Sequence, residues 1–122
     1  MPLALTDVKI DMAAERDGAW IGDIPDLPGV DLLVRGWECP AARALLMRLA
    51  RKDTPLAEAE IHVLRDVILL DWRGLTDDGE AFAFTPDAAA KLLEEPEYRL
   101  FRAAVRWASE QVGKSARMRS RG

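Results

Sequence analysis

The spacing of apolar residues changes near residue 40, and this change constrains the fold more than any other feature of the sequence. Before that point, short segments alternate between apolar and polar residues, which is typical of half-buried strands. After it, apolar residues recur every three or four positions, which is typical of helices with one buried face. The 122 residues suffice for one hydrophobic core. We therefore expect a single α+β domain over residues 1–113, mainly helical, followed by a disordered basic tail at 114–122.

Three short extended segments are expected before the change of period. Leu5–Met12 alternates, with Val8, Ile10 and Met12 on one face and Asp7, Lys9 and Asp11 on the other. Asp17-Gly18 is a turn signal, and Ala19–Ile21 follows it as a second segment. Val30–Val34 alternates again. The pattern predicts a small antiparallel hairpin or three-stranded sheet over about residues 5–34.

About four helices are expected over residues 40–112, and a proline marks the start of each, because its fixed φ suits a first helical position. These starts are Pro40, Thr54-Pro55, Thr85-Pro86 and Pro96, and both threonines are natural N-caps. The last helix carries an apolar stripe and ends near Gly113; the stripe comprises Phe101, Val105, Ala108 and Val112.

The segment between the second and third helices is less uniform. Val67–Trp72 is compatible with either helix or strand, because it is rich in β-branched residues. Asp78-Gly79 marks a tight turn. The extended segment after it places Phe82 and Phe84 on one face.

Composition argues against most hydrolases and metalloenzymes. The chain has one cysteine, Cys39, and one histidine, His62, so an intramolecular disulfide is excluded and a catalytic triad could be built only around His62. Neither residue lies in a pattern that indicates a metal site, and no glycine-rich phosphate loop is present. We therefore expect no catalysis, no metal and no cofactor.

Charge is unevenly distributed along the chain, which carries a net charge of −4. Residues 39–52 and 114–122 each hold four basic and no acidic side chains. The first of these segments forms a helix that could belong to a helix-turn-helix, but the helix after it carries Glu58, Glu60 and Asp66, which phosphates would repel. No signal peptide or long apolar run is seen, so we expect the protein in the cytoplasm.

The segment Leu69–Glu95 resembles tail assembly chaperones, a group of small tail proteins of long-tailed bacteriophages and prophages. The resemblance rests on an ordered series of motifs: an aliphatic run ending in Trp72-Arg73-Gly74, the turn Asp78-Gly79, then Phe84-Thr85-Pro86, and a short helix with Leu92-Leu93. A looser resemblance extends over about residues 18–112.

This resemblance implies a non-catalytic role in the bacterial host cell. Such proteins bind the tape measure protein and tail tube subunits during tail assembly, are usually absent from the mature particle, and sometimes exist in a frameshift-extended form. The aromatic and basic residues of the motif, with one further tryptophan, are the expected partner-binding residues: Trp72, Arg73, Phe82, Phe84 and Trp107. The main alternative is a structural virion component, such as a tail-tip or connector subunit; a DNA-binding regulator ranks below it.

Overall fold

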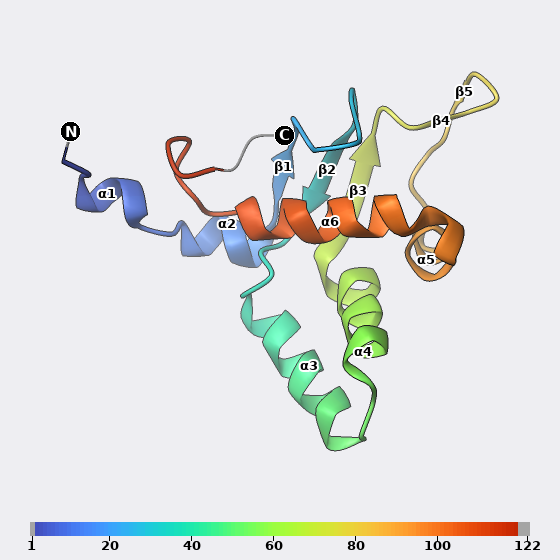
Figure 1. Ribbon diagram of the computed structural model, residues 1–122, viewed down its shortest axis with the longest axis horizontal. Coiled ribbons are helices and arrows are strands. Elements are labelled where there is room, and N and C mark those ends of the chain that lie inside the picture. Colours follow the sequence, from blue (N-terminus) through green and yellow to red (C-terminus); the bar gives the residue numbers. More distant parts are fainter. Residues whose placement is uncertain (1, 120–122) are drawn as a thin grey trace.

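A computed structural model describes residues 2–119, and the α+β class is confirmed (Figure 1). The helical elements are α1 (Leu5–Val8), α2 (Met12–Asp17), α3 (Pro40–Arg51), α4 (Leu56–Val63), the π-helical turn η1 (Leu64–Ile68), α5 (Pro86–Glu94), the 3₁₀ turn η2 (Pro96–Tyr98) and α6 (Arg99–Gln111). The strands are β1 (Ala19–Ile21), β2 (Asp31–Val34), β3 (Leu69–Arg73), β4 (Thr76–Asp77) and β5 (Glu80–Ala81).

The main sheet is antiparallel with strand order β1-β2-β3, and a separate hairpin pairs β4 with β5. The predicted strands at 19–21 and 30–34 are confirmed. The predicted strand over Leu5–Met12 is wrong, because this segment forms α1 and the start of α2. β2 already has β1 on one side and β3 on the other, so no position beside it is open to a further strand.

Local signals in the sequence place most of the helices correctly. Pro40 is the first residue of α3, and the Thr85 hydroxyl caps α5 by accepting a hydrogen bond of 3.0 Å from the Ala88 amide. The second helix begins one residue later than predicted: Pro55 is the N-cap of α4, and no side chain caps it. The ambiguous stretch 67–72 contains both structures, because η1 ends at Ile68 and β3 follows it.

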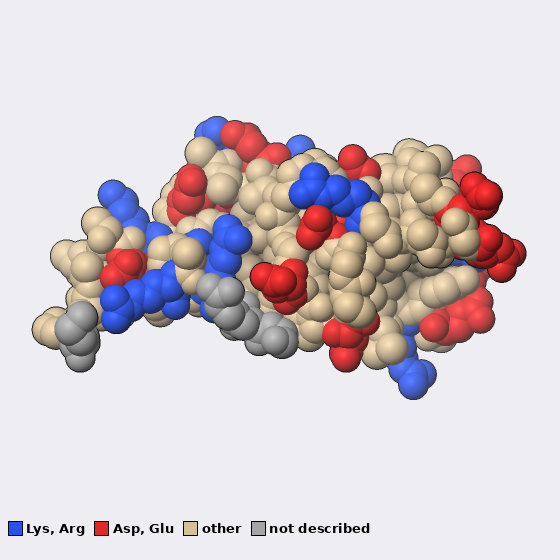
Figure 2. All heavy atoms as spheres, turned by 90° about the horizontal axis from the view of Figure 1, so that it is seen from above, with Lys and Arg blue, Asp and Glu red and all other residues tan. Residues whose placement is uncertain are grey.

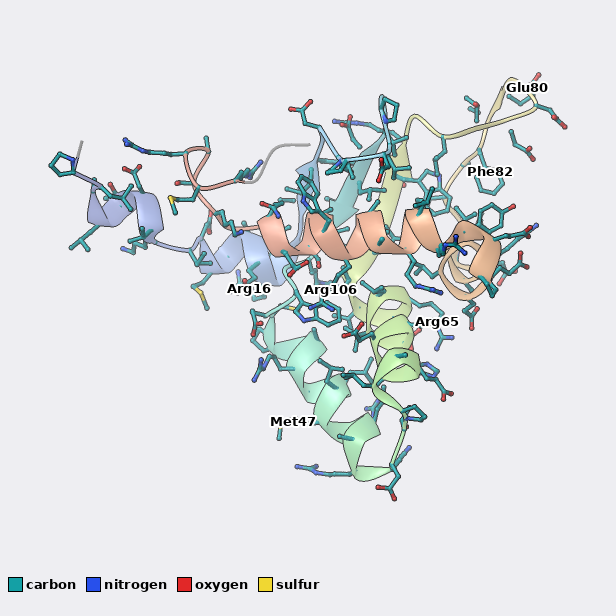
Figure 3. All side chains as sticks on the ribbon, viewed as in Figure 1. Arg16, Met47, Arg65, Glu80, Phe82 and Arg106 are labelled. Atoms are coloured by element: carbon teal, nitrogen blue, oxygen red, sulfur yellow. The ribbon has the colours of Figure 1, made fainter. Side chains whose placement is uncertain are left out.

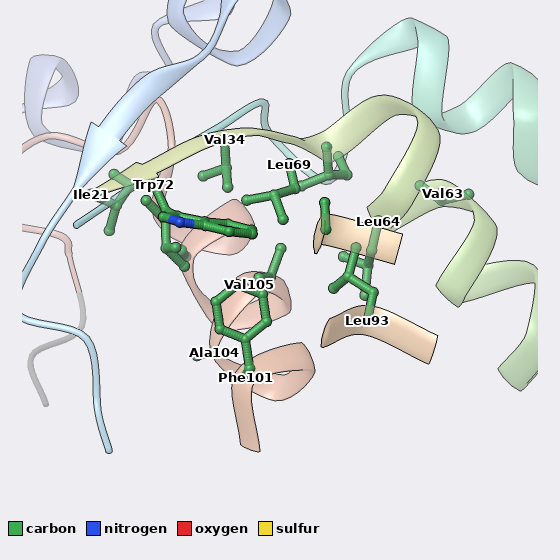
Figure 4. Close-up of a cluster of buried hydrophobic side chains, with 14 of the residues drawn as sticks. Ile21, Val34, Val63, Leu64, Leu69, Trp72, Leu93, Phe101, Ala104 and Val105 are labelled. Atoms are coloured by element: carbon green, nitrogen blue, oxygen red, sulfur yellow. The ribbon is translucent and has the colours of Figure 1, made fainter. Parts of the chain in front are cut away.

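Helix α6 crosses the inner face of the sheet and supplies much of the core (Figures 1 and 4). Its predicted apolar stripe is confirmed, since all four side chains are buried: Phe101, Val105, Ala108 and Val112. They pack in one cluster with Leu32 and Val34 of β2 and with the buried residues of α5. Each large apolar side chain buried in this way contributes about 1.5–3 kcal/mol to folding.

Helices α3 and α4 form an antiparallel pair that extends away from the sheet and α6 (Figures 1 and 3). Met47 on α3 and Leu56 on α4 are exposed on this pair. Within residues 2–119, no helix is long and apolar enough to cross a membrane.

The C-terminal segment, predicted to be disordered, is described only as far as Arg119, and residues 120–122 lie outside the described part. In the described part, the Ser115 hydroxyl donates a hydrogen bond of 2.8 Å to the backbone oxygen of Asp7. The Arg117 guanidinium lies 3.9 Å from the Asp7 carboxylate. These contacts connect the basic segment with α1.

Candidate functional site

Trp72 is the centre of an aromatic cluster beneath the β4–β5 hairpin. Its ring centroid lies 5.8 Å from that of Phe82, 4.9 Å from that of Phe84 and 5.6 Å from that of Phe101. The Phe82 ring is stacked on the indole, and the other two rings meet it edge-on. The indole Nε1 also donates a hydrogen bond of 2.7 Å to the backbone oxygen of Phe82. Trp72 therefore holds the segment after the hairpin by its ring and by its polar atom.

The chain reaches this arrangement through turns that require unusual backbone angles. Gly74 has a φ of 94°, and a Cβ atom there would lie 2.2 Å from the backbone oxygen of Gly29. Asp78 and Gly79 both have positive φ values at the tip of the hairpin. The Phe82 amide then donates to the Leu75 oxygen at 2.9 Å, which closes the hairpin and directs the chain back over Trp72.

The structure does not bring the five predicted partner-binding residues onto one surface. Trp72 is only 4% exposed, so it supports the hairpin from below. Phe82 and Phe84 are half-buried against it. Arg73 lies on the outer face of the sheet, where it covers the Trp20 ring at 4.2 Å and pairs with Asp31 at 2.8 Å.

Trp107 lies apart from this cluster. It is half-buried and borders a small hollow beside Ile21, at the C-terminal half of α6. The predicted contact residues thus fall into three separate places: the aromatic cluster, the outer sheet face and the far end of α6.

An apolar groove of about 400 Å³ lies between the hairpin segment and α6, and we call it the hairpin groove. Its apolar lining residues are Leu27, Leu75, Phe82, Leu92, Tyr98, Leu100 and Phe101. Leu100, near the start of α6, is 62% exposed although its side chain is large and apolar. Its polar lining residues are Thr76, Asp77, Lys91 and Glu97, so carboxylates outnumber the one ammonium, and acidic side chains gather at this end of the molecule (Figure 2). The surface is suited to an apolar segment with basic flanks.

A second groove, of about 360 Å³, runs along the opposite flank of α6, between this helix and α4. We call it the arginine groove, because Arg99, Arg102 and Arg106 line it, with Ala57, Glu60, Ile61, Leu64 and Ala103 as the remaining residues. These three arginines are not among the binding residues predicted from the sequence. Their spacing at i, i+3 and i+7 is the signal that could have revealed them, since it places all three on one face of a helix.

Of these three arginines, Arg106 is the one that its contacts hold in place. Its guanidinium lies 3.8 Å from the centre of the Trp37 ring, and its Nη1 donates a hydrogen bond of 3.1 Å to Glu60 (Figure 3). Its Nε is buried and lies 3.6 Å from a Glu110 oxygen, beyond hydrogen-bond distance. Arg106 therefore connects α6 with α4 and with the loop before α3.

His62, the residue around which a catalytic triad would have to be built, is engaged in a structural network. Arg65 donates to His62 Nδ1 at 2.7 Å and to Glu94 at 3.0 Å, and it also pairs with Asp66 at 2.8 Å. The hydrogen bond from Arg65 lowers the pKa of Asp66. The network links η1 with α5.

An acidic side chain, that of Glu15, is buried near the start of the sheet. Burial, and then the nearby Glu38 carboxylate, raise the pKa of Glu15, whose side chain covers Gly36. In the described part of the chain, no group of three or more His, Cys, Asp or Glu side chains is placed to hold a metal ion. The hairpin groove and the arginine groove are the larger of the hollows described for residues 2–119.

Comparison with known proteins gives one match. The sequence model of a family described as YdaY prophage protein matches residues 41–120. Neither the curated proteins nor the solved structures include a match. The matched span runs from α3 through α6 and covers most of the lining of both grooves. It accounts for more than half of the chain, which therefore belongs to the YdaY prophage protein family.

Proposed function

We propose that this prophage protein is a tail assembly chaperone, which binds an apolar helical segment of a tape measure-type protein and recruits tail tube subunits. The observation that carries the proposal is the hairpin groove. It is built partly from the segment whose motifs resemble the tail assembly chaperones, which supplies Leu75 and Phe82, and it leaves apolar surface uncovered. Membership of a prophage family is in keeping with this role.

The proposed mechanism is masking, without catalysis. Apolar side chains of the client helix would pack against Leu100, Phe82 and Tyr98 until tube assembly replaces these contacts. An interface made of several modest contacts is suited to release. The protein would act in the cytoplasm of the bacterial host and leave before the particle is complete.

The test is an affinity pull-down of the tagged chain from cells producing the prophage particles, with mass spectrometry of the pull-down and of the purified particles. We expect a long helical protein in the pull-down and no copies of this chain in the particles. Stoichiometric presence in particles would instead identify a structural virion component.

A matched pair of variants connects the result with the groove. Leu100→Ser removes a side chain that is 62% exposed in the hairpin groove, and Met47→Ser removes one that is 57% exposed on α3. Burial of a leucine contributes about 1.5–3 kcal/mol, and more than half of that is still available at Leu100, so its loss should weaken client binding roughly 5- to 30-fold. Equal binding by the two variants would refute the assignment of the client to this groove.

A further inference from the structure

The arginine groove contains two positive charges that the described part of the chain leaves without a carboxylate. Arg99 is exposed and makes no side-chain hydrogen bond or ion pair within residues 2–119. Arg102 is half-buried, and it donates one hydrogen bond of 3.1 Å to the backbone oxygen of Leu93. Arg106, in contrast, has Glu60 beside it. The charge that remains to be balanced therefore lies at the N-terminal half of α6.

Apart from Glu60, the rest of the groove is apolar. Ala57 and Ile61 come from α4, Leu64 comes from η1, and Ala103 lies between the arginines on α6. Small side chains on both walls let another backbone approach closely, and the volume of about 360 Å³ holds a few side chains rather than a whole helix. An element that docks here would rest on the groove and insert one row of apolar residues, as amphipathic helices do in hydrophobic grooves.

We propose that the arginine groove binds an amphipathic helix of another protein whose apolar face is flanked by acidic residues. Arg99 and Arg102 are about 4.5 Å apart along the axis of α6, which matches carboxylates three or four residues apart on a partner helix. A guanidinium has five N–H donors, and Arg102 uses one of them in the contact with Leu93, so a partner carboxylate can be bound in bidentate fashion. The apolar floor and the Glu60 carboxylate favour such a helix over a nucleic acid backbone.

This proposal does not rest on the proposed chaperone function, which concerns the hairpin groove on the other flank of α6. The two grooves differ in the sign of their net charge, because Asp77, Glu97 and one lysine line the hairpin groove, whereas three arginines and Glu60 line the arginine groove. The failure of one proposal therefore leaves the other intact.

The test places the photo-cross-linking residue p-benzoylphenylalanine at Ala103 of the full chain, in cells producing the prophage particles, and identifies the cross-linked peptide by mass spectrometry. Ala44, which is exposed on α3, serves as the control position. We expect a peptide from another protein with helical apolar spacing and acidic residues three or four apart. A cross-link to a second copy of this chain, to nucleic acid or to a peptide without such acidic residues would overturn the proposal. A yield no higher than that at Ala44 would do the same.

The identified peptide is then synthesised, and its binding to purified protein is measured by fluorescence anisotropy. Arg99→Glu should weaken binding at least tenfold, while Arg51→Glu, on the exposed face of α3, should leave it unchanged. Arg102→Gln removes the charge but, because its side chain is shorter, also the contact with the Leu93 oxygen, so Arg99→Glu is the cleaner variant. A peptide with lysine at its acidic positions should bind the Arg99→Glu variant better than the native protein; the reverse order would refute the charge pairing.

Discussion

Replacement of Trp72 by phenylalanine tests whether this residue holds the hairpin segment in place. The change keeps an aromatic ring against Phe82, Phe84 and Phe101 but removes the indole N–H. The Phe82 backbone oxygen then loses a donor at 2.7 Å. A smaller ring also leaves space in a cluster where Trp72 is only 4% exposed.

The expected decrease in the free energy of unfolding follows from the lost hydrogen bond and the lost volume. A hydrogen bond within a protein contributes about 0.5–1.5 kcal/mol net. The volume lost from the cluster adds a cavity cost, and part of the aromatic contact energy is kept because the new side chain is still a ring. Together these amount to a destabilisation of about 1–2 kcal/mol. At this chain length, that corresponds to a decrease in Tm of roughly 4–8 °C.

Urea denaturation measures the total loss, and amide hydrogen exchange shows where it occurs. The Phe82 amide, which donates to Leu75 at 2.9 Å, should exchange faster in the Trp72→Phe variant, because the hairpin opens more often. The control is Trp20→Phe on the outer sheet face, where the side chain is 37% exposed and the cost should stay within about 0.5 kcal/mol. Unchanged exchange at Phe82, or equal losses in the two variants, would refute the reasoning.

Three further predictions concern single residues. The raised pKa of the buried Glu15 means that its ionisation opposes folding, so native stability should fall as the pH rises from the ordinary value of 4.5 through the raised value. Glu15→Gln should therefore raise Tm at pH 7 but not below pH 4.5, and thermal melts that show no gain at pH 7 would contradict this. Gly74→Ala should cost at least about 1 kcal/mol in urea denaturation, because a Cβ would meet the Gly29 oxygen at 2.2 Å with φ at +94°; a neutral result would mean that the turn can shift. Thr85→Ala should cost about 1 kcal/mol and Thr85→Ser much less, since the hydroxyl caps α5; circular dichroism during denaturation measures both.

The elements that the sequence predicted correctly depend on neighbours in the chain. Pro40 begins α3, Thr85 caps α5, and Gly113 follows α6 with a positive φ of 84°. Each of these signals acts within one helical turn, so the rest of the fold has little influence on it. The buried stripe of α6 was also predictable, because its period sets which side chains share a face.

The segment 5–12 shows where local patterns fail. Val8, Ile10 and Met12 alternate as in a strand, yet all three are exposed, and α1 buries none of its residues. A strand needs a partner edge, and whether one is free depends on pairing between distant parts of the chain. Here β3, from residues 69–73, takes the place beside β2, and residues 5–12 pair with neither outer edge of the sheet.

The candidate sites, too, were predictable from the sequence only in part. The resemblance of residues 69–95 directed attention to the hairpin segment and placed Trp72 among the contact residues, but the structure places the Trp72 ring under the hairpin at 4% exposure. The arginine groove exists because α4 and α6, which are distant in sequence, meet at Glu60 and Arg106.

The sequence by itself determined the class of fold, the start of most helices after residue 40 and the face that α6 buries, because these depend on interactions within a few residues. Only the tertiary structure decided which strands pair, which aromatic side chain is covered and where two helices leave a groove between them. These features depend on contacts between segments far apart in the chain. The free energy of such contacts cannot be predicted from local sequence patterns.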